Sequence, residues 1–166
     1  MYLGGVFVRK IIKCLISIIL IANIHGCVVA TPKSDYKMKL TNNYELWKIN
    51  PNKVVIRMPD GDGGLITKTS GKVIELDYND EYIIARSIPT YKIDGMELDN
   101  YKEKEEYIES IPEEEYEFWI IDIEKDEVYG PLNEDEFYKK RKEILVPESM
   151  ELKALDTYKE DFEYVE

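Results

Sequence analysis

The segment 59–71 (PDGDGGLITKTSG) is the part of the sequence that most resembles a ligand-binding loop. Asp60 and Asp62 supply two carboxylates, and the three glycines beside them let backbone carbonyls turn inward, as the oxygen ligands of calcium must. Counted from Asp60, however, the fifth and twelfth positions of an EF-hand loop fall on Gly64 and Gly71, which have no side-chain oxygen. The spacing therefore favours a flexible hairpin loop, with calcium binding as the alternative.

Carboxylates are the only abundant reactive side chains, because the chain contains 34 Asp and Glu against 1 His and 2 Cys. Two carboxyl groups roughly 5 to 9.5 Å apart suffice for glycoside hydrolysis. A carboxylate-based hydrolase is therefore the least favoured alternative, with no pair singled out by the sequence. We assign no catalytic, cofactor-binding or metal-ligating residue, and we expect the protein not to be an enzyme.

Both cysteines lie in or beside an apolar N-terminal segment. Arg9, Lys10 and Lys13 precede the run 14–24 (CLISIILIANI), an order that is typical of a secretory signal peptide. A helix of this length would extend about 17 Å, well short of a hydrocarbon core roughly 30 Å thick. We expect residues 1–26 to be a signal peptide.

The four residues Ile24-His25-Gly26-Cys27 resemble the lipobox of bacterial lipoproteins, in which a branched aliphatic residue stands three before the cysteine and a small residue directly before it. His25 departs from the small residue usual at its position. The resemblance implies cleavage after Gly26 and a diacylglyceryl group on the sulfur of Cys27. Two acyl chains would anchor the protein firmly, since each buried methylene contributes about 0.8 kcal/mol. Cys27 is thus the expected lipid attachment site.

An uncleaved N-terminal anchor and ordinary secretion are the alternatives for this segment. The apolar run reaches seventeen residues if it is extended through Ala30, but the glycine, histidine and asparagine within it weigh against burial in a bilayer. All three interpretations predict an extracytoplasmic domain.

The charge and composition after cleavage exclude several function classes. Lys and Arg would fall from 22 to 19 while Asp and Glu stay at 34, so the net charge would change from −12 to −15. Such a surface repels nucleic acid and attracts basic partners. We therefore expect no nucleic acid among the partners, which would be the membrane, through the lipid, and a basic protein or cationic envelope component. Without His or a free Cys, the mature chain cannot form a Ser-His-Asp triad, a Cys-His pair, a disulfide framework or the usual zinc site.

Two further groups of residues have both a functional and a structural interpretation. The segment 97–117 carries ten acids against two lysines, and it could hold a basic partner or divalent cations, although a solvated helix and linker is favoured. Six aromatic residues could line a carbohydrate-stacking surface, although such residues more often fill a sheet core. They are Tyr44, Trp47, Tyr82, Tyr116, Phe118 and Trp119.

Three pairs of segments rich in aromatic and β-branched residues predict β-hairpins, because a turn-forming segment separates the members of each pair. The pairs are 44–49 with 53–58, 72–77 with 81–88, and 116–122 with 127–132. Four consecutive apolar residues at 118–121 predict a central strand covered on both faces. We expect an α+β fold with a mostly antiparallel six-stranded sheet, either a curled roll or a small sandwich.

The segment 133–146 predicts a C-terminal helix that packs on this sheet. Asn133 and Glu136 have the spacing of a capping box, and Pro147 ends the helix. The apolar stripe expected to face the sheet consists of Phe137, Ile144 and Leu145.

The other segments have weaker signals. A second, acidic helix is expected over 100–111 and a short edge element over 150–155, while 159–166 is expected to fray. The chain then divides into a signal peptide at 1–26, a lipidated cysteine and flexible tether at 27–43, a single globular domain at 44–158 and an acidic tail at 159–166. A fully extended tether would span roughly 50 Å.

The block WIID, VYGPL and EDEF, from Trp119 to Phe137, resembles an uncharacterised domain of small predicted lipoproteins of Gram-positive bacteria. The segments YELWKI and VIELDYNDEYIIA fit the same resemblance, which covers residues 44–153. It implies a location and a domain extent but no chemistry. We therefore expect a membrane-tethered extracytoplasmic lipoprotein that serves as an interaction or structural module with an acidic surface. A ligand-binding module for wall fragments, peptides or cations is the alternative.

Overall fold

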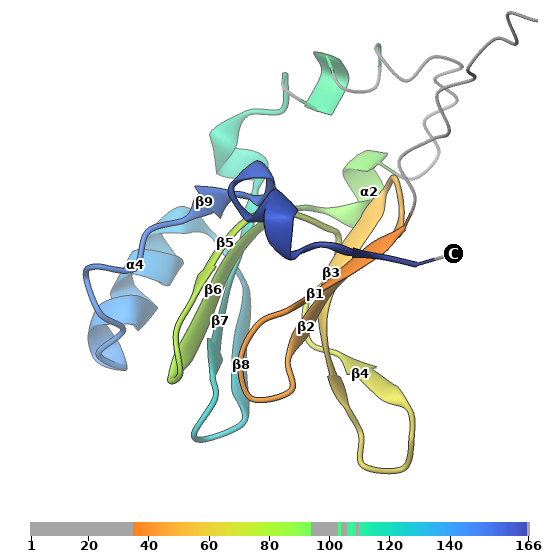
Figure 1. Cartoon of the computed structure of the whole chain (residues 1–166). Coiled ribbons are helices and arrows are strands. Elements are labelled where there is room, and N and C mark those ends of the chain that lie inside the picture. Colours follow the sequence, from red (N-terminus) through yellow and green to blue (C-terminus); the bar gives the residue numbers. More distant parts are fainter. Residues whose placement is uncertain (1–34, 94–102, 104–105, 109, 166) are drawn as a thin grey trace, which may run out of the picture. The chain divides into compact units, whose positions relative to one another are not determined.

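The computed structural model describes residues 35–93, 103, 106–108 and 110–165, which form a mixed α/β fold dominated by one open ten-stranded sheet (Figure 1). The strands are β1 (Tyr36–Lys39), β2 (Glu45–Asn50), β3 (Lys53–Pro59), β4 (Leu65–Thr67), β5 (Lys72–Tyr78), β6 (Tyr82–Ile88), β7 (Glu117–Asp122), β8 (Glu127–Leu132), β9 (Lys153–Ala154) and β10 (Glu163–Tyr164). The helical segments are α2 (Thr90–Ile93), η1 (Glu113–Glu115), α4 (Glu134–Glu143) and η2 (Leu155–Asp161).

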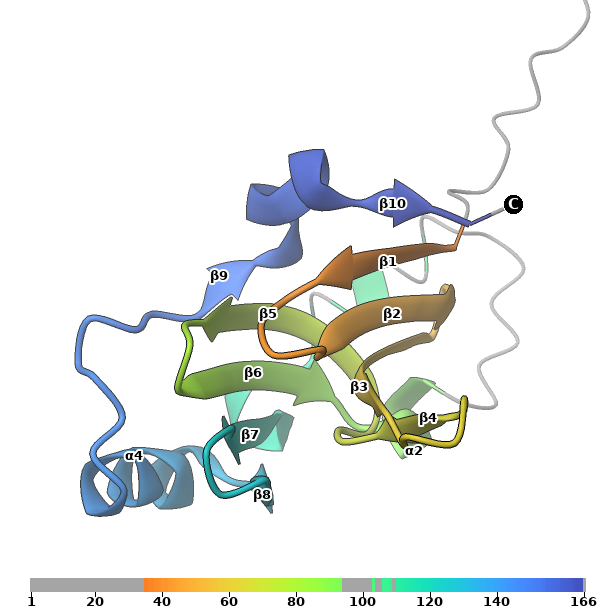
Figure 2. The same ribbon diagram turned by 60° about the horizontal axis from the view of Figure 1, so that its bottom comes forward.

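The strand order is β10-β1-β2-β3-β5-β6-β7-β8, with β4 paired to β3 and β9 paired to β5 (Figure 2). The pairings are antiparallel except for β3 with β5, which run parallel and meet through Val54 and Lys72. The three predicted hairpins are confirmed as β2–β3, β5–β6 and β7–β8. Gly71, just before β5, has a φ of +73°, and a Cβ there would collide with the carbonyl oxygen of Ile88.

The predicted number of six strands is wrong, because short strands extend the sheet beyond the three hairpins. Strand β1 lies inside the segment 27–43 that the sequence assigns to a tether, and β10 lies inside the predicted acidic tail. Both assignments are corrected: β1 places Met38 in the core at 0% exposure, and β10 pairs with β1. Strands of four and two residues are too short to show a period in the sequence.

The sheet bends where β3 meets β5, so that its two halves enclose a common inner cluster. The buried members of this cluster are Met38, Tyr44, Leu46, Val54, Ile56, Val73, Leu76, Ile83, Ala85, Trp119 and Ile121. They come from both β1–β3 and β5–β7, which explains why a single open sheet can surround a core without a second sheet. The curled-roll alternative therefore describes the fold better than a sandwich does.

Helix α4 covers the outer face of β7 and β8, where it closes an outer cluster. The buried members of this cluster are Ile84, Phe118, Ile120, Phe137, Val146 and Met150. The predicted capping box is present: the Asn133 side chain accepts a hydrogen bond from Glu136 N at 2.9 Å, and Glu136 accepts one from Asn133 N at 3.0 Å. Phe137 is buried and Ile144 is half-buried as predicted, but Leu145 is 81% exposed. The prediction for Leu145 is wrong because the chain leaves the helix there with a φ of +63°.

Strand β7 is covered on both faces, as four consecutive apolar residues predict. Trp119 and Ile121 belong to the inner cluster, whereas Phe118 and Ile120 belong to the outer cluster. The strand lies between β6 and β8.

The weaker acidic helix expected over 100–111 lies largely outside the described residues. Of that segment, Glu103 and residues 106–108 are helical, and Ile111 is buried beside Ile88 and Ile93.

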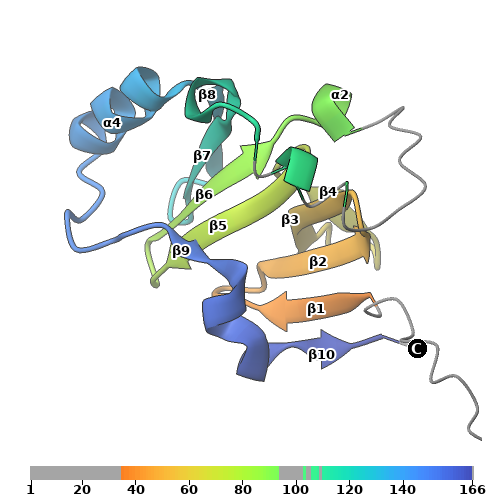
Figure 3. The ribbon, with the colours of Figure 1, turned by 90° about the horizontal axis from the view of Figure 1, so that it is seen from above.

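The turns after β1, β3, β5 and β7 lie at one end of the sheet, whereas the β2–β3 turn and the two ends of the described domain lie at the other. Antiparallel pairing places the turns after β1, β3, β5 and β7 together, and Thr41 and Asn42 both hydrogen-bond to Asp80 across two of them. At the other end, Val165 N donates a hydrogen bond to Asp35 O at 2.9 Å. Figure 3 shows β10, β1 and β2 side by side along this part of the sheet.

Replacement of Phe137 by Ala should destabilise the domain by about 3 to 5 kcal/mol, because Phe137 is fully buried and stacks against Phe118 at 5.0 Å between ring centroids. The measurement is urea unfolding followed by tryptophan fluorescence. Tyr138→Ala is the matched control, since Tyr138 is 48% exposed, and it should change the free energy of unfolding by less than about 1 kcal/mol. Equal effects of the two substitutions would contradict this packing.

Candidate functional site

The segment 59–71, for which calcium binding was the alternative to a hairpin loop, contains the turn between β3 and β4. The Asp60 carboxylate oxygen Oδ1 accepts hydrogen bonds from the backbone nitrogens of Asp62 and Gly64, both at 2.8 Å. This carboxylate therefore stabilises its own turn, in agreement with the favoured hairpin interpretation. Over the described ranges, no group of three or more His, Cys, Asp or Glu side chains could hold a metal ion.

The six aromatic residues do not assemble into one stacking surface. Trp119 is 6% exposed, and its Nε1 donates a hydrogen bond to Ser87 Oγ at 2.9 Å. Trp47, on β2, instead donates through Nε1 to Glu45 at 2.8 Å. Tyr44 and Trp119 belong to the inner cluster, whereas Tyr82, Tyr116 and Phe118 pack with the outer one. Five of the six side chains thus contribute to the core, as the favoured interpretation predicts, whereas Trp47 is half-buried beneath Arg57 and belongs to neither cluster.

The acidic run 97–117 is described only in part, since 97–102, 104–105 and 109 lie outside the described residues. Glu113 and Glu114 are exposed on η1, and Glu115 forms an ion pair with Lys92. Burial raises the pKa of the Glu117 carboxyl above its ordinary value, against the opposing effect of a hydrogen bond from Ser70. The described part of the run therefore does not form a single acidic surface. Cys27 likewise lies outside the described residues.

A groove of about 440 Å³ brings together charged residues that the sequence did not single out. We call it the glutamate groove, and its walls come from β5, β6, β7, α4 and the segment 148–152. Its charged lining consists of Glu75, Arg86, Glu134, Arg141, Glu148 and Glu151. Phe118, Met150 and Leu152 add apolar surface.

Both arginines of the groove are already engaged. Arg86 forms an ion pair with Glu75 at 2.7 Å and lies over the Tyr116 ring at 4.8 Å from its centroid. Arg141 donates hydrogen bonds to the carbonyl oxygens of Pro147 at 3.0 Å and Met150 at 2.8 Å. By contrast, the carboxylates of Glu134, Glu148 and Glu151 form no ion pair within the described part of the chain. The groove is therefore locally anionic.

Two other hollows are lined mainly by turns. One, of about 520 Å³, lies beside residues 50–53 and Thr90. The other, of about 310 Å³, lies between residues 39–45 and Pro59. Neither combines apolar surface with several carboxylates, so the glutamate groove is the better candidate site.

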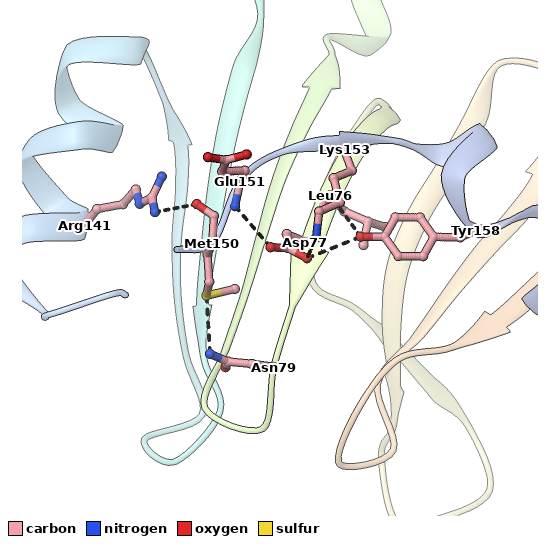
Figure 4. A network of polar contacts seen from close by, with 8 residues as sticks. All are labelled: Leu76, Asp77, Asn79, Arg141, Met150, Glu151, Lys153 and Tyr158. Carbon is pink, nitrogen blue, oxygen red and sulfur yellow. Dashed lines mark hydrogen bonds and ion pairs between the residues drawn. The ribbon is translucent and has the colours of Figure 1, made fainter. Parts of the chain in front are cut away.

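A buried carboxylate on β5 holds the segment that forms one wall of the groove (Figure 4). Asp77, 8% exposed, accepts hydrogen bonds from Glu151 N at 3.1 Å, Lys153 Nζ at 3.0 Å and the Tyr158 hydroxyl at 3.3 Å. Burial, together with the negative charge of Asp77, raises the pKa of the Tyr158 hydroxyl, so that it remains a donor at alkaline as well as neutral pH. These bonds fix the backbone on which Glu151 stands.

Sequence reasoning missed this groove because its charged residues are far apart in the chain. Arg141, on α4, donates hydrogen bonds to carbonyls that lie beyond the end of the helix. The helix ends at Glu143, before the predicted end at Pro147, and no local sequence pattern indicates the contacts that Arg141 makes past it.

The described residues thus define a single-sheet α/β domain with an anionic groove and no helix that is both long and apolar enough to cross a membrane. Residues 41–157, well over half of the chain, match the model of a family described as protein of unknown function (DUF3997), and the chain belongs to that family. The match includes the WIID…VYGPL…EDEF block and agrees with the resemblance to a domain of unknown function. Neither a curated protein nor a solved structure matches the chain.

Replacement of Asp77 by Asn should loosen the segment 151–158. The amide has no charge to pair with Lys153, and its NH2 group would face groups that are themselves hydrogen-bond donors, such as Glu151 N. We expect amide hydrogen exchange in that segment to accelerate by about tenfold to a hundredfold, with smaller changes in β6 and β7.

Asp156→Asn is the control for that experiment, since Asp156 is exposed and pairs only with Lys159 among the described residues. Exchange in 151–158 should hardly change in this variant. Unchanged exchange in the Asp77 variant would show that the carboxylate does not hold the segment.

Proposed function

We propose that this protein is a membrane-tethered extracytoplasmic interaction module that binds a basic partner through its acidic surface. The observation that carries the proposal is the glutamate groove, in which both arginines are engaged while Glu134, Glu148 and Glu151 form no ion pair with any described residue. A net charge of −12 for the whole chain adds a long-range attraction for cationic partners.

The tethering part of the proposal rests on the lipobox-like residues that end at Cys27. Because β1 begins at Tyr36, only eight residues separate Cys27 from the start of the strand. Eight residues span at most about 29 Å, so a lipid on Cys27 would hold the domain closer to the bilayer than the longer tether first expected. The turns after β1, β3, β5 and β7 would then point away from the membrane, since they lie at the end of the sheet opposite Asp35.

The lipid anchor can be tested by metabolic labelling with a clickable palmitate analogue. Wild-type protein should take up label and remain in the membrane fraction, whereas Cys27→Ala should lose the label because the acceptor sulfur is absent. Cys14→Ala is the matched control and should keep the label. Label that persists in Cys27→Ala would refute lipidation of Cys27. Equal membrane retention of the wild type and Cys27→Ala would favour an uncleaved anchor.

Binding of a basic partner can be tested with decalysine as a model cation and full-length protein in neutral detergent micelles. Binding should be measurable at about 50 mM salt and weaken steeply toward about 500 mM, because salt screens interactions between exposed charges. Decaglutamate is the control and should not bind. Equal binding of both peptides, or none of decalysine at low salt, would contradict an acidic interaction surface.

A further inference from the structure

We propose that the glutamate groove binds the side chain of one lysine or arginine presented by an extended peptide. This inference rests on the proposed function and identifies where a basic partner is recognised. A volume of about 440 Å³ suits a single long side chain together with its own backbone.

A smaller, apolar part of the groove lining offers surface to the stem of such a side chain. Phe118 and Met150 are each 4% exposed and belong to the outer cluster, and Leu152 is half-buried beside them. Lysine and arginine carry three or four methylene groups that pack on apolar surface while the charged end stays near water. A small inorganic cation would gain nothing from this apolar surface.

The carboxylates around the groove stand on an ordered backbone. Glu134 is the first residue of α4, whose N-terminus is fixed by the capping box. The backbone of Glu151 is held by Asp77, and the carbonyl of Pro147, directly before Glu148, is held by Arg141. These acids are not clustered tightly enough to hold a metal ion within the described residues, which fits the larger head of an organic cation. A positioned set of charges loses less entropy on binding than a flexible one.

A second observation favours a peptide over a free amine. Arg86 lines the groove, and its Nε atom, which lies out of reach of solvent, has no hydrogen-bond acceptor among the described residues. A buried donor without a partner is destabilising, and a small shift of the side chain toward a ligand carbonyl would relieve it. A lysine or arginine within a peptide supplies both the cation and a nearby carbonyl, whereas a polyamine supplies only cations.

The test measures the dissociation constant of the blocked peptide Gly-Gly-Lys-Gly-Gly with the full-length protein in neutral detergent micelles, from the chemical shifts of the peptide. The same peptide with norleucine in place of lysine retains the stem and the carbonyls but loses the charge. It should bind at least about tenfold more weakly. Spermidine should not displace the lysine peptide at equal concentration.

Matched variants locate the site. Glu148→Gln with Glu151→Gln should weaken binding by about threefold to tenfold, because two exposed charge pairs are lost. Glu113→Gln with Glu114→Gln makes the same change of charge on exposed residues of η1 and should leave the dissociation constant within about twofold. Since all four side chains are exposed, unfolding curves should confirm that both double variants remain folded.

Three outcomes would overturn the inference. Equal weakening by the two double variants would show that net charge, not the groove, attracts the peptide. Binding of decalysine without measurable binding of the single-lysine peptide would also reject the groove and leave the acidic interaction surface standing. If spermidine binds as tightly as the lysine peptide, the ligand of the groove would be a free polyamine and not a peptide. If decalysine also fails to bind, the proposed function itself fails.

Discussion

Strand β5 divides one of its edges between two partners, and the rest of the fold depends on that division. Its first residue, Lys72, pairs with β3, while Glu75 and Leu76 pair with β9. A backbone edge can be hydrogen-bonded only once at each position, so β3 has to turn away from β5 after a single pair. The sheet bends at this point, which lets its two halves share the inner cluster. The same edge positions β9 and, with it, the wall of the glutamate groove.

Polar residues of β5 and β6 form ion pairs and hydrogen bonds on the outer face of the sheet. Glu75 neutralises Arg86 across the two strands, and Asp77 fixes the chain on either side of β9. Arg141 adds a third attachment by binding the carbonyls of Pro147 and Met150. Glu75 therefore neutralises Arg86, carbonyls hold Arg141, and the exposed glutamates of the groove form no ion pair with the described residues. The local negative charge follows from how the fold is held together.

The sequence was informative where a pattern is long and local. The three hairpins, the strand covered on both faces and the capping box at Asn133 all follow from alternation, turn residues or spacing within a few positions. Strands β1 and β10 could not be predicted, because two to four residues give no periodicity and their pairing joins residues 36 and 164. The bend between β3 and β5 was equally hidden, since no local signal specifies a single parallel pair.

The candidate site was the least predictable feature for the same reason. Glu75, Arg86, Glu134 and Glu148 look like ordinary surface charges in an acidic chain, and only the fold brings them to one groove. The loop at 59–71 resembles a cation site in the sequence because its acids are adjacent, yet the Asp60 carboxylate accepts hydrogen bonds from the backbone of its own turn. Adjacent acids are easy to recognise in a sequence, whereas a site assembled from distant strands can be recognised only when the topology of the sheet is known.

The position of β1 between β2 and β10 has a mechanical consequence. When the domain is held at the turns opposite Asp35, a pull on the chain at Asp35 acts parallel to β1, and both of its antiparallel ladders have to slide at once. Hydrogen bonds that lie across the direction of force share the load, whereas bonds at a peeled edge break one after another. The first strand of the domain is thus placed to resist extension, although it has only four residues.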